Sequence, residues 1–102
     1  MPVQTFISEE AITACLSGEI DHHTAKPIRL EIDELTQRVT PTQLVLDFRD
    51  VSFMDSSGIG VIIGRYRTLT RRNGSVAVRN PSPAVDRIFQ MSGLYQIIEK
   101  CR

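Results

Sequence analysis

The segment Leu44–Phe48 is short, almost entirely apolar and bounded by polar residues. A run of this kind is typical of a strand buried on both faces, and such strands lie in the middle of parallel sheets that helices cover. The stretches around it, Ile28–Val39 and Ser57–Arg72, carry apolar residues at helical spacing. A buried strand between two helices predicts an α/β fold with a mixed, mostly parallel β-sheet and helices packed on it.

The N-terminal segments alternate between apolar and polar residues. Val3–Ser8 and Ala11–Ser17 each show the two-residue period of a half-buried strand, and Glu9-Glu10 between them is typical of a tight turn. We therefore expect an antiparallel hairpin whose second strand ends at Gly18.

The first helix has clear start and stop residues. Asp21 or Thr24 can cap its start, and Pro27 is acceptable only in the first turn. Thr40-Pro41-Thr42 ends it. Its apolar stripe recurs at spacings of four, three and four residues: Ile28, Ile32, Leu35 and Val39.

The C-terminal third repeats the pattern of strand and helix. Ser75–Arg79 predicts a strand, Ser82-Pro83 predicts the cap and first position of a third helix, and Leu94–Glu99 predicts a last strand. With Arg49–Met54 interpreted as a connection, the order is β-β-α-β-α-β-α-β. One domain then covers residues 1–102.

The second helix begins at an unusual sequence, Asp55-Ser56-Ser57-Gly58. Ser, Asp and Gly are helix-start residues because they satisfy the free N–H groups of the first turn, so we expect a serine-capped, exposed helix N-terminus. Glycines at 58, 60 and 64 each cost roughly 1 kcal/mol in a helix relative to alanine. Close packing on the sheet, or a partner's close approach, would offset that cost. The expected buried face of this helix comprises Ile59, Ile62, Ile63, Tyr66 and Leu69.

Charge is distributed unevenly along the chain. Residues 1–55 contain ten acids and four bases, whereas residues 56–85 contain five arginines and no acid, although the net charge is zero. Ser56 lies at that boundary. The uneven charge indicates either ordinary solvated surface charge or a polarised protein-binding face. Zero net charge and few aromatic residues disfavour nucleic-acid binding. No segment suits a membrane span or a signal peptide, so we expect a cytoplasmic protein without a membrane partner.

Several residues invite other chemistry. Ser56 with His22 or His23 suggests a hydrolase, but the glycines of a nucleophile elbow are missing. The two histidines lack a third metal ligand at a recognisable spacing, and Cys15 and Cys101 match no metal pattern. Gly58, Gly60 and Gly64 do not follow a strand directly, as a dinucleotide motif requires. We therefore expect no metal or cofactor and no catalysis. A nucleotide- or anion-binding module that uses the same helix N-terminus remains an alternative.

A serine at an exposed helix N-terminus can act as a switch. Phosphorylation would add about −1.5 to −2 charges, which the helix dipole tolerates. Asp55 is adjacent, and Asp21 is close if its loop lies at the same end of the sheet. A partner that matched the unmodified serine would then be repelled and would have to desolvate a dianion.

Five stretches resemble the STAS-domain anti-sigma factor antagonists. Their order matches along nearly the whole chain, and the Asp-His-His-Thr-Ala stretch points to the sporulation branch, the anti-sigma F factor antagonists. The stretches are Asp21–Ala25, Ser52–Gly58, Gly64–Tyr66, Ser82–Val85 and Met91–Leu94.

The resemblance implies a non-enzymatic protein that binds an anti-sigma factor and so frees a sigma factor. That partner would also be the serine kinase that phosphorylates Ser56, and a PP2C-type phosphatase would reverse the modification. Asp21 would lie near the serine, and Ser57 and Gly58 would complete the helix start, with Gly58 keeping the approach clear. The implied partner-binding set is Asp21, His22, Asp55, Ser56, Ser57 and Gly58. The family continues into a C-terminal helix, whereas this sequence stops at Arg102.

Overall fold

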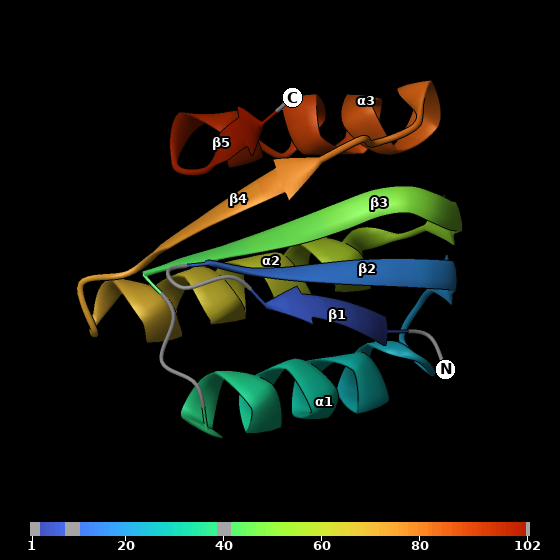
Figure 1. The fold of residues 1–102 in the computed structure, drawn as a ribbon. Helices are drawn as coiled ribbons and strands as arrows, with labels where there is room; N and C mark the ends of the chain where they lie inside the picture. The colour runs from blue at the N-terminus through green and yellow to red at the C-terminus, as the bar shows by residue number, and fades with distance from the viewer. Residues whose placement is uncertain (1–2, 8–10, 39–41, 102) are drawn as a thin grey trace.

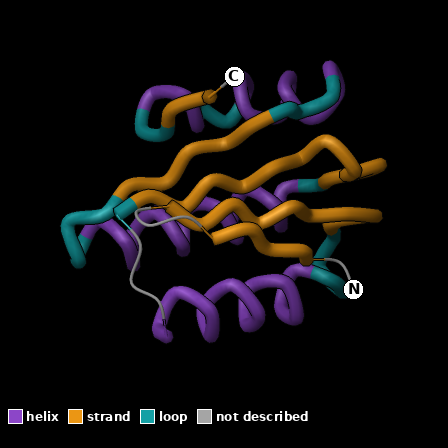
Figure 2. The backbone as a smooth tube through the Cα atoms, in the orientation of Figure 1, coloured by secondary structure: helices purple, strands orange, loops and turns teal. Residues whose placement is uncertain are grey.

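Five strands lie side by side in the order β1-β2-β3-β4-β5 (Figure 2). The computed structural model describes residues 3–7, 11–38 and 42–101. β1 runs antiparallel to β2, and every other neighbouring pair is parallel, which confirms the predicted mixed sheet and its hairpin. The strands are β1 (Val3–Ile7), β2 (Ala11–Ile20), β3 (Gln43–Met54), β4 (Ser75–Arg79) and β5 (Glu99–Cys101).

Three helices connect the parallel strands in the predicted order (Figure 1). They are α1 (Ala25–Arg38), α2 (Ser56–Thr70) and α3 (Pro83–Met91), and a short 3₁₀ turn, η1 (Leu94–Gln96), follows α3. Ser82 caps α3 as expected, because its hydroxyl accepts a hydrogen bond from the Val85 N–H. None of the described helices has the length and apolar character that crossing a membrane requires.

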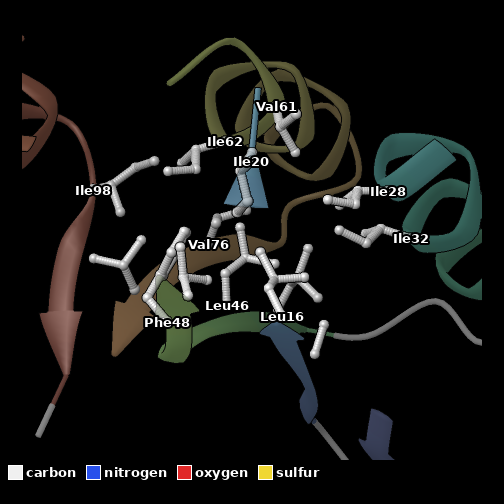
Figure 3. Packing of buried hydrophobic residues seen from close by; sticks show 14 of the residues in the cluster. Leu16, Ile20, Ile28, Ile32, Leu46, Phe48, Val61, Ile62, Val76 and Ile98 are labelled. Atoms are coloured by element: carbon white, nitrogen blue, oxygen red, sulfur yellow. The ribbon is translucent and has the colours of Figure 1, made fainter. Parts of the chain in front are cut away.

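The hydrophobic core lies between one face of the sheet and the helices. Figure 3 shows strand residues such as Leu16 and Leu46 pointing toward residues of α1 and α2. Ile28 and Ile32 of the predicted α1 stripe are fully buried, which confirms the orientation of that helix. On α2 the buried face is rotated from the prediction: Val61 and Arg65 are buried, whereas Ile59, Ile63 and Tyr66 are only partly covered.

Two strands are longer than the sequence predicts. Gly18 does not end β2; it adopts a φ of 80°, which only glycine tolerates readily, and lies at one of two register shifts that let the strand continue to Ile20. The expected connection Arg49–Met54 is also wrong, because these residues extend β3. Alternation is lost at the bulges, so the pattern hid both extensions.

The prediction of a last strand over Leu94–Glu99 is wrong in its position, because the observed strand shares only Glu99 with it. Leu94–Gln96 forms η1, and β5 begins only at Glu99, because Gly93 has a φ of 77° and turns the chain before the strand starts. The expected Glu9-Glu10 turn and Val39 of the α1 stripe lie outside the described residues.

Candidate functional site

The site is built where β2 and β3 end next to each other. Ile20 and Met54 are register partners in the parallel pair, and the Asp55 N–H donates to the Ile20 carbonyl at 3.1 Å. Asp21 and Asp55 directly follow these partners, so both lie at the same edge of the sheet. The condition under which we expected Asp21 near the serine is therefore met.

Asp21 organises the turn into α1. Its Oδ1 accepts hydrogen bonds from the N–H groups of His23 at 2.8 Å and Thr24 at 3.1 Å, while the Asp21 N–H donates to Thr24 Oγ1 at 3.0 Å. The hydrogen bonds from Thr24 and His23 hold the pKa of Asp21 below its usual value. The predicted capping alternatives, Asp21 and Thr24, thus act together, and the carboxylate is ionised at neutral pH.

Asp55, not a serine, caps α2. Its backbone is extended, and its carboxylate accepts the Ser57 N–H at 2.8 Å. Both a carboxylate and a serine hydroxyl can accept at this position, but only the carboxylate also carries a charge complementary to the helix dipole. Ser56 is therefore released from capping and is exposed as the first residue of the helix, whereas Ser57 is half-buried.

Gly58 packs inward and does not keep an approach clear. It is buried, and a Cβ at this position would overlap Sδ and Cγ of Met54, itself buried at the end of β3. Close contact with the sheet therefore accounts for this glycine. Packing does not account for Gly60 and Gly64, where a Cβ would meet no atom within 4 Å.

The two serines face different surroundings. Ser56 borders a hollow of about 370 Å³ between α2 and α3, which we call the apolar hollow, and Ser57 borders one between α1 and α2, which we call the basic hollow. The apolar hollow is lined by Ser56, Ile59, Ile88, Met91 and Ser92. The basic hollow is lined by His22, Ala25, Lys26, Arg29, Ser57, Gly60 and Val61.

The sequence prediction missed most of the apolar hollow. Ile88 is only partly covered, and Met91 is 80% exposed. A signal was present, since Met91 falls outside the helical spacing of Val85 and Phe89. Large apolar residues left exposed beside a polar one are typical of an interaction surface.

The hydrolase interpretation gains no support from the geometry. Among the described residues, no hydrogen bond joins the Ser56 hydroxyl to an imidazole, and the rings of His22 and His23 contact each other with centroids 3.9 Å apart. His22 lines the hollow on the Ser57 side, away from the hollow that Ser56 borders.

Comparison with known proteins assigns the chain to a family. The STAS domain model matches residues 4–102. The chain is 46% identical over 83 residues to an anti-sigma F factor antagonist of Paenibacillus polymyxa, covering 81% of this chain and 71% of that protein. It is 33% identical over 92 residues to an anti-sigma-B factor antagonist of Bacillus subtilis strain 168, covering 90% and 83%.

Two solved structures share the fold. The anti-sigma factor antagonist SpoIIAA in its unphosphorylated form superposes with a TM-score of 0.83 at 36% identity, covering 98% of this chain and 88% of that one. The Bacillus cell fate determinant SpoIIAA in the phosphorylated form superposes with a TM-score of 0.75 at 35% identity, covering 98% and 91%. These matches confirm the resemblance inferred from the sequence, and the chain belongs to the STAS domain family.

Proposed function

We propose that this protein is an anti-sigma factor antagonist switched by phosphorylation of Ser56. The unmodified protein binds an anti-sigma factor in the cytoplasm and so frees a sigma factor. The anti-sigma factor is also the kinase that modifies Ser56, and a PP2C-type phosphatase removes the phosphate. The protein itself catalyses nothing. Its similarity to named antagonists, one of them solved in unphosphorylated and phosphorylated forms, supports the assignment.

The position of Ser56 is the observation that carries the proposal. Its side chain is exposed, lies at the first residue of α2, and takes no part in capping that helix because Asp55 does so. A kinase can therefore reach the hydroxyl without unfolding the helix start. Ser57 is half-buried and its N–H is bonded to Asp55, so it is the poorer substrate.

The apolar hollow explains why a phosphate would end binding. A partner that buries Ile59, Ile88 and Met91 must also cover Ser56 at the rim of the same hollow. A phosphate there would have to lose its water against an apolar surface and would lie close to Asp55. Asp21, His22 and Ser57 would form the other side of the partner's footprint, and buried Gly58 would contribute by seating the helix start on Met54.

The kinase reaction tests the proposal. We expect incubation with ATP and the anti-sigma F factor of Paenibacillus polymyxa to place one phosphate on the chain, which peptide mass spectrometry should locate at Ser56. Ser57→Ala serves as the matched control and should still be modified, whereas Ser56→Ala should not. Phosphate on Ser57, or on neither serine, would contradict the proposal.

The alternative of an anion-binding module is less well supported. The start of α2 already holds the carboxylate of Asp55 on the Ser57 N–H, and that negative charge opposes a second anion at the same N–H groups. Calorimetry with nucleotides alone separates the two functions, because the antagonist proposal expects no tight nucleotide binding in the absence of a protein partner.

A further inference from the structure

The basic hollow lies on the opposite side of the α2 start from the apolar hollow. It is a depression of about 370 Å³ between the first turns of α1 and α2. Lys26 and Arg29, three residues apart on α1, lie on one side of it, and Ser57 and Gly60 of α2 lie on the other. No acidic side chain is among the residues that line it.

The two cations at this hollow lack an internal counter-charge. Within the part of the chain that the structure describes, neither Lys26 nor Arg29 has a carboxylate within 4 Å. Two other arginines of the same helix pair have a carboxylate partner, whereas Arg67 of α2 has none among the described residues: Arg65 lies 2.8 Å from Asp33, and Arg38 lies 3.3 Å from Glu34. Burial lowers the pKa of Arg65 and Asp33 opposes that change, but the nearby charge of Arg29 lowers it further. Arg29 therefore lies close enough to Arg65 for its charge to act on that side chain, with a smaller effect than the opposing one of Asp33.

Three backbone donors near the hollow are already occupied. Asp55 accepts the Ser57 N–H at the start of α2, and Asp21 accepts the His23 and Thr24 N–H groups before α1. A free phosphate or nucleotide would meet two flexible side chains here, and the carboxylates that hold these N–H groups would repel its multiple charges. A singly charged carboxylate carried by a protein surface suits the site better.

We propose that an acidic side chain of the anti-sigma factor docks in the basic hollow between Lys26 and Arg29. This inference rests on the proposed function, because a partner that covers Ser56 also covers the adjacent Ser57 at the rim of this hollow. The partner would thus straddle the start of α2, with an apolar contact toward α3 and an ion pair toward α1. The ion pair would favour fast association and fix the orientation of the partner.

Charge reversal tests the ion pair. We expect Lys26→Glu/Arg29→Glu to weaken binding to the anti-sigma F factor of Paenibacillus polymyxa at least about tenfold, and the neutral Lys26→Met/Arg29→Met to weaken it less. Salt should weaken binding of the wild type more than that of the neutral variant, because the ion pair is screened. Lys26→Glu places a glutamate in the first turn of α1, where it suits the helix dipole, and residue 29 is exposed, so the melting temperature should be retained.

The matched control reverses two exposed arginines at the far end of α2. Arg67→Glu/Arg71→Glu changes the net charge equally and should leave affinity within about twofold, which separates a local ion pair from the overall charge. Equal losses in both double variants would overturn the inference in favour of general electrostatic attraction.

Three further outcomes are distinguishable. If the wild type binds and is phosphorylated on Ser56 but Lys26→Glu/Arg29→Glu binds equally well, the inference is wrong while the proposed function stands. If the wild type does not bind the anti-sigma factor, both fail. If inorganic phosphate or ATP alone shifts the side-chain NMR signals of Lys26 and Arg29 and competes with the partner, the hollow is a small-anion site and the assignment to a protein carboxylate is wrong.

Discussion

At the scale of single residues, each position of Asp55-Ser56-Ser57-Gly58 has a different role. Asp55 caps the helix, Ser56 is exposed, Ser57 donates its N–H to the cap, and Gly58 is buried on Met54. The division follows from helix geometry, because consecutive residues point about 100° apart and cannot share one environment.

Gly58→Ala should destabilise the protein, although alanine is the better helix former. The added methyl would overlap Met54, and overpacking of this kind costs about 1–3 kcal/mol. Gly64→Ala is the matched control; its Cβ meets no atom within 4 Å, so it should stabilise by up to ~1 kcal/mol. Urea unfolding measures both, and equal shifts of one sign would refute the packing argument.

At the scale of elements, a polar cluster ties the C-terminal segments together. Asp86 of α3 accepts hydrogen bonds from the Tyr95 hydroxyl of η1, from Lys100 Nζ of β5 at 3.1 Å and from Gln90 Nε2 at 2.8 Å. β5 has only three residues, so its hydrogen bonds to β4 alone contribute little to holding it in the sheet. The ring of Tyr95 packs edge-on against Phe89, which joins this cluster to the core.

Tyr95→Phe should cost about 1.5 kcal/mol at neutral pH, because it removes one hydrogen bond to a carboxylate. That hydrogen bond is the main reason why the pKa of Asp86 lies below its usual value; Lys100 lowers it further, while burial opposes both. A lowered folded-state pKa stabilises the fold above the unfolded pKa, and this stability is lost as pH falls through the folded value. The difference in unfolding free energy between Tyr95→Phe and the wild type should therefore become smaller as the pH falls into the acid range.

Tyr66→Phe is the matched control for this series. Among the described residues the Tyr66 hydroxyl has no hydrogen-bond partner. The unfolding free energy of Tyr66→Phe should therefore follow that of the wild type at every pH. A Tyr95→Phe deficit that stayed constant down to acid pH would show that the Asp86 carboxylate is not the group involved.

At the scale of the whole molecule, the uneven charge of the sequence is partly neutralised inside the fold. Asp33 of the acidic half pairs with buried Arg65 of the basic stretch, and Arg72 Nη1 donates to the Thr36 carbonyl at 3.1 Å. These contacts hold α1 against α2 below their first turns. The helix that carries Ser56 is therefore held in place by contacts away from its first turn. A charge added at Ser56 should alter binding more than folding.

Ser56→Asp should weaken binding to the anti-sigma F factor by roughly tenfold or more, with a melting temperature within a few degrees of the wild type. A negative charge at the start of a helix is tolerated, so the loss arises at the surface. Ser75→Asp adds the same charge to an exposed serine at the start of β4 and should bind normally. Unchanged affinity of Ser56→Asp, or a collapsed melting temperature, would contradict the charge mechanism.

Local patterns in the sequence were enough to predict the order of elements, the buried stripe of α1 and the exposed helix start. Apolar periodicity and capping residues are encoded within a few positions, so Ile28 and Ile32, Ser82-Pro83 and Asp55–Gly58 were found without a structure. The resemblance added the choice of Ser56 over Ser57, which stays a prediction; the structure shows that Ser56 is exposed and Ser57 half-buried.

Contacts between distant segments decided the rest. At two register shifts β3 has one residue more than β2, which lets the pair continue until Ile20 pairs with Met54, and only that register brings Asp21 beside Asp55. The same packing places Gly58 against Met54 at the end of β3. Ser56 then borders the apolar hollow and Ser57 the basic hollow, which Lys26 and Arg29 also line. Register and hollows depend on residues far apart in the chain, whereas periodicity reports only which face of one segment is buried.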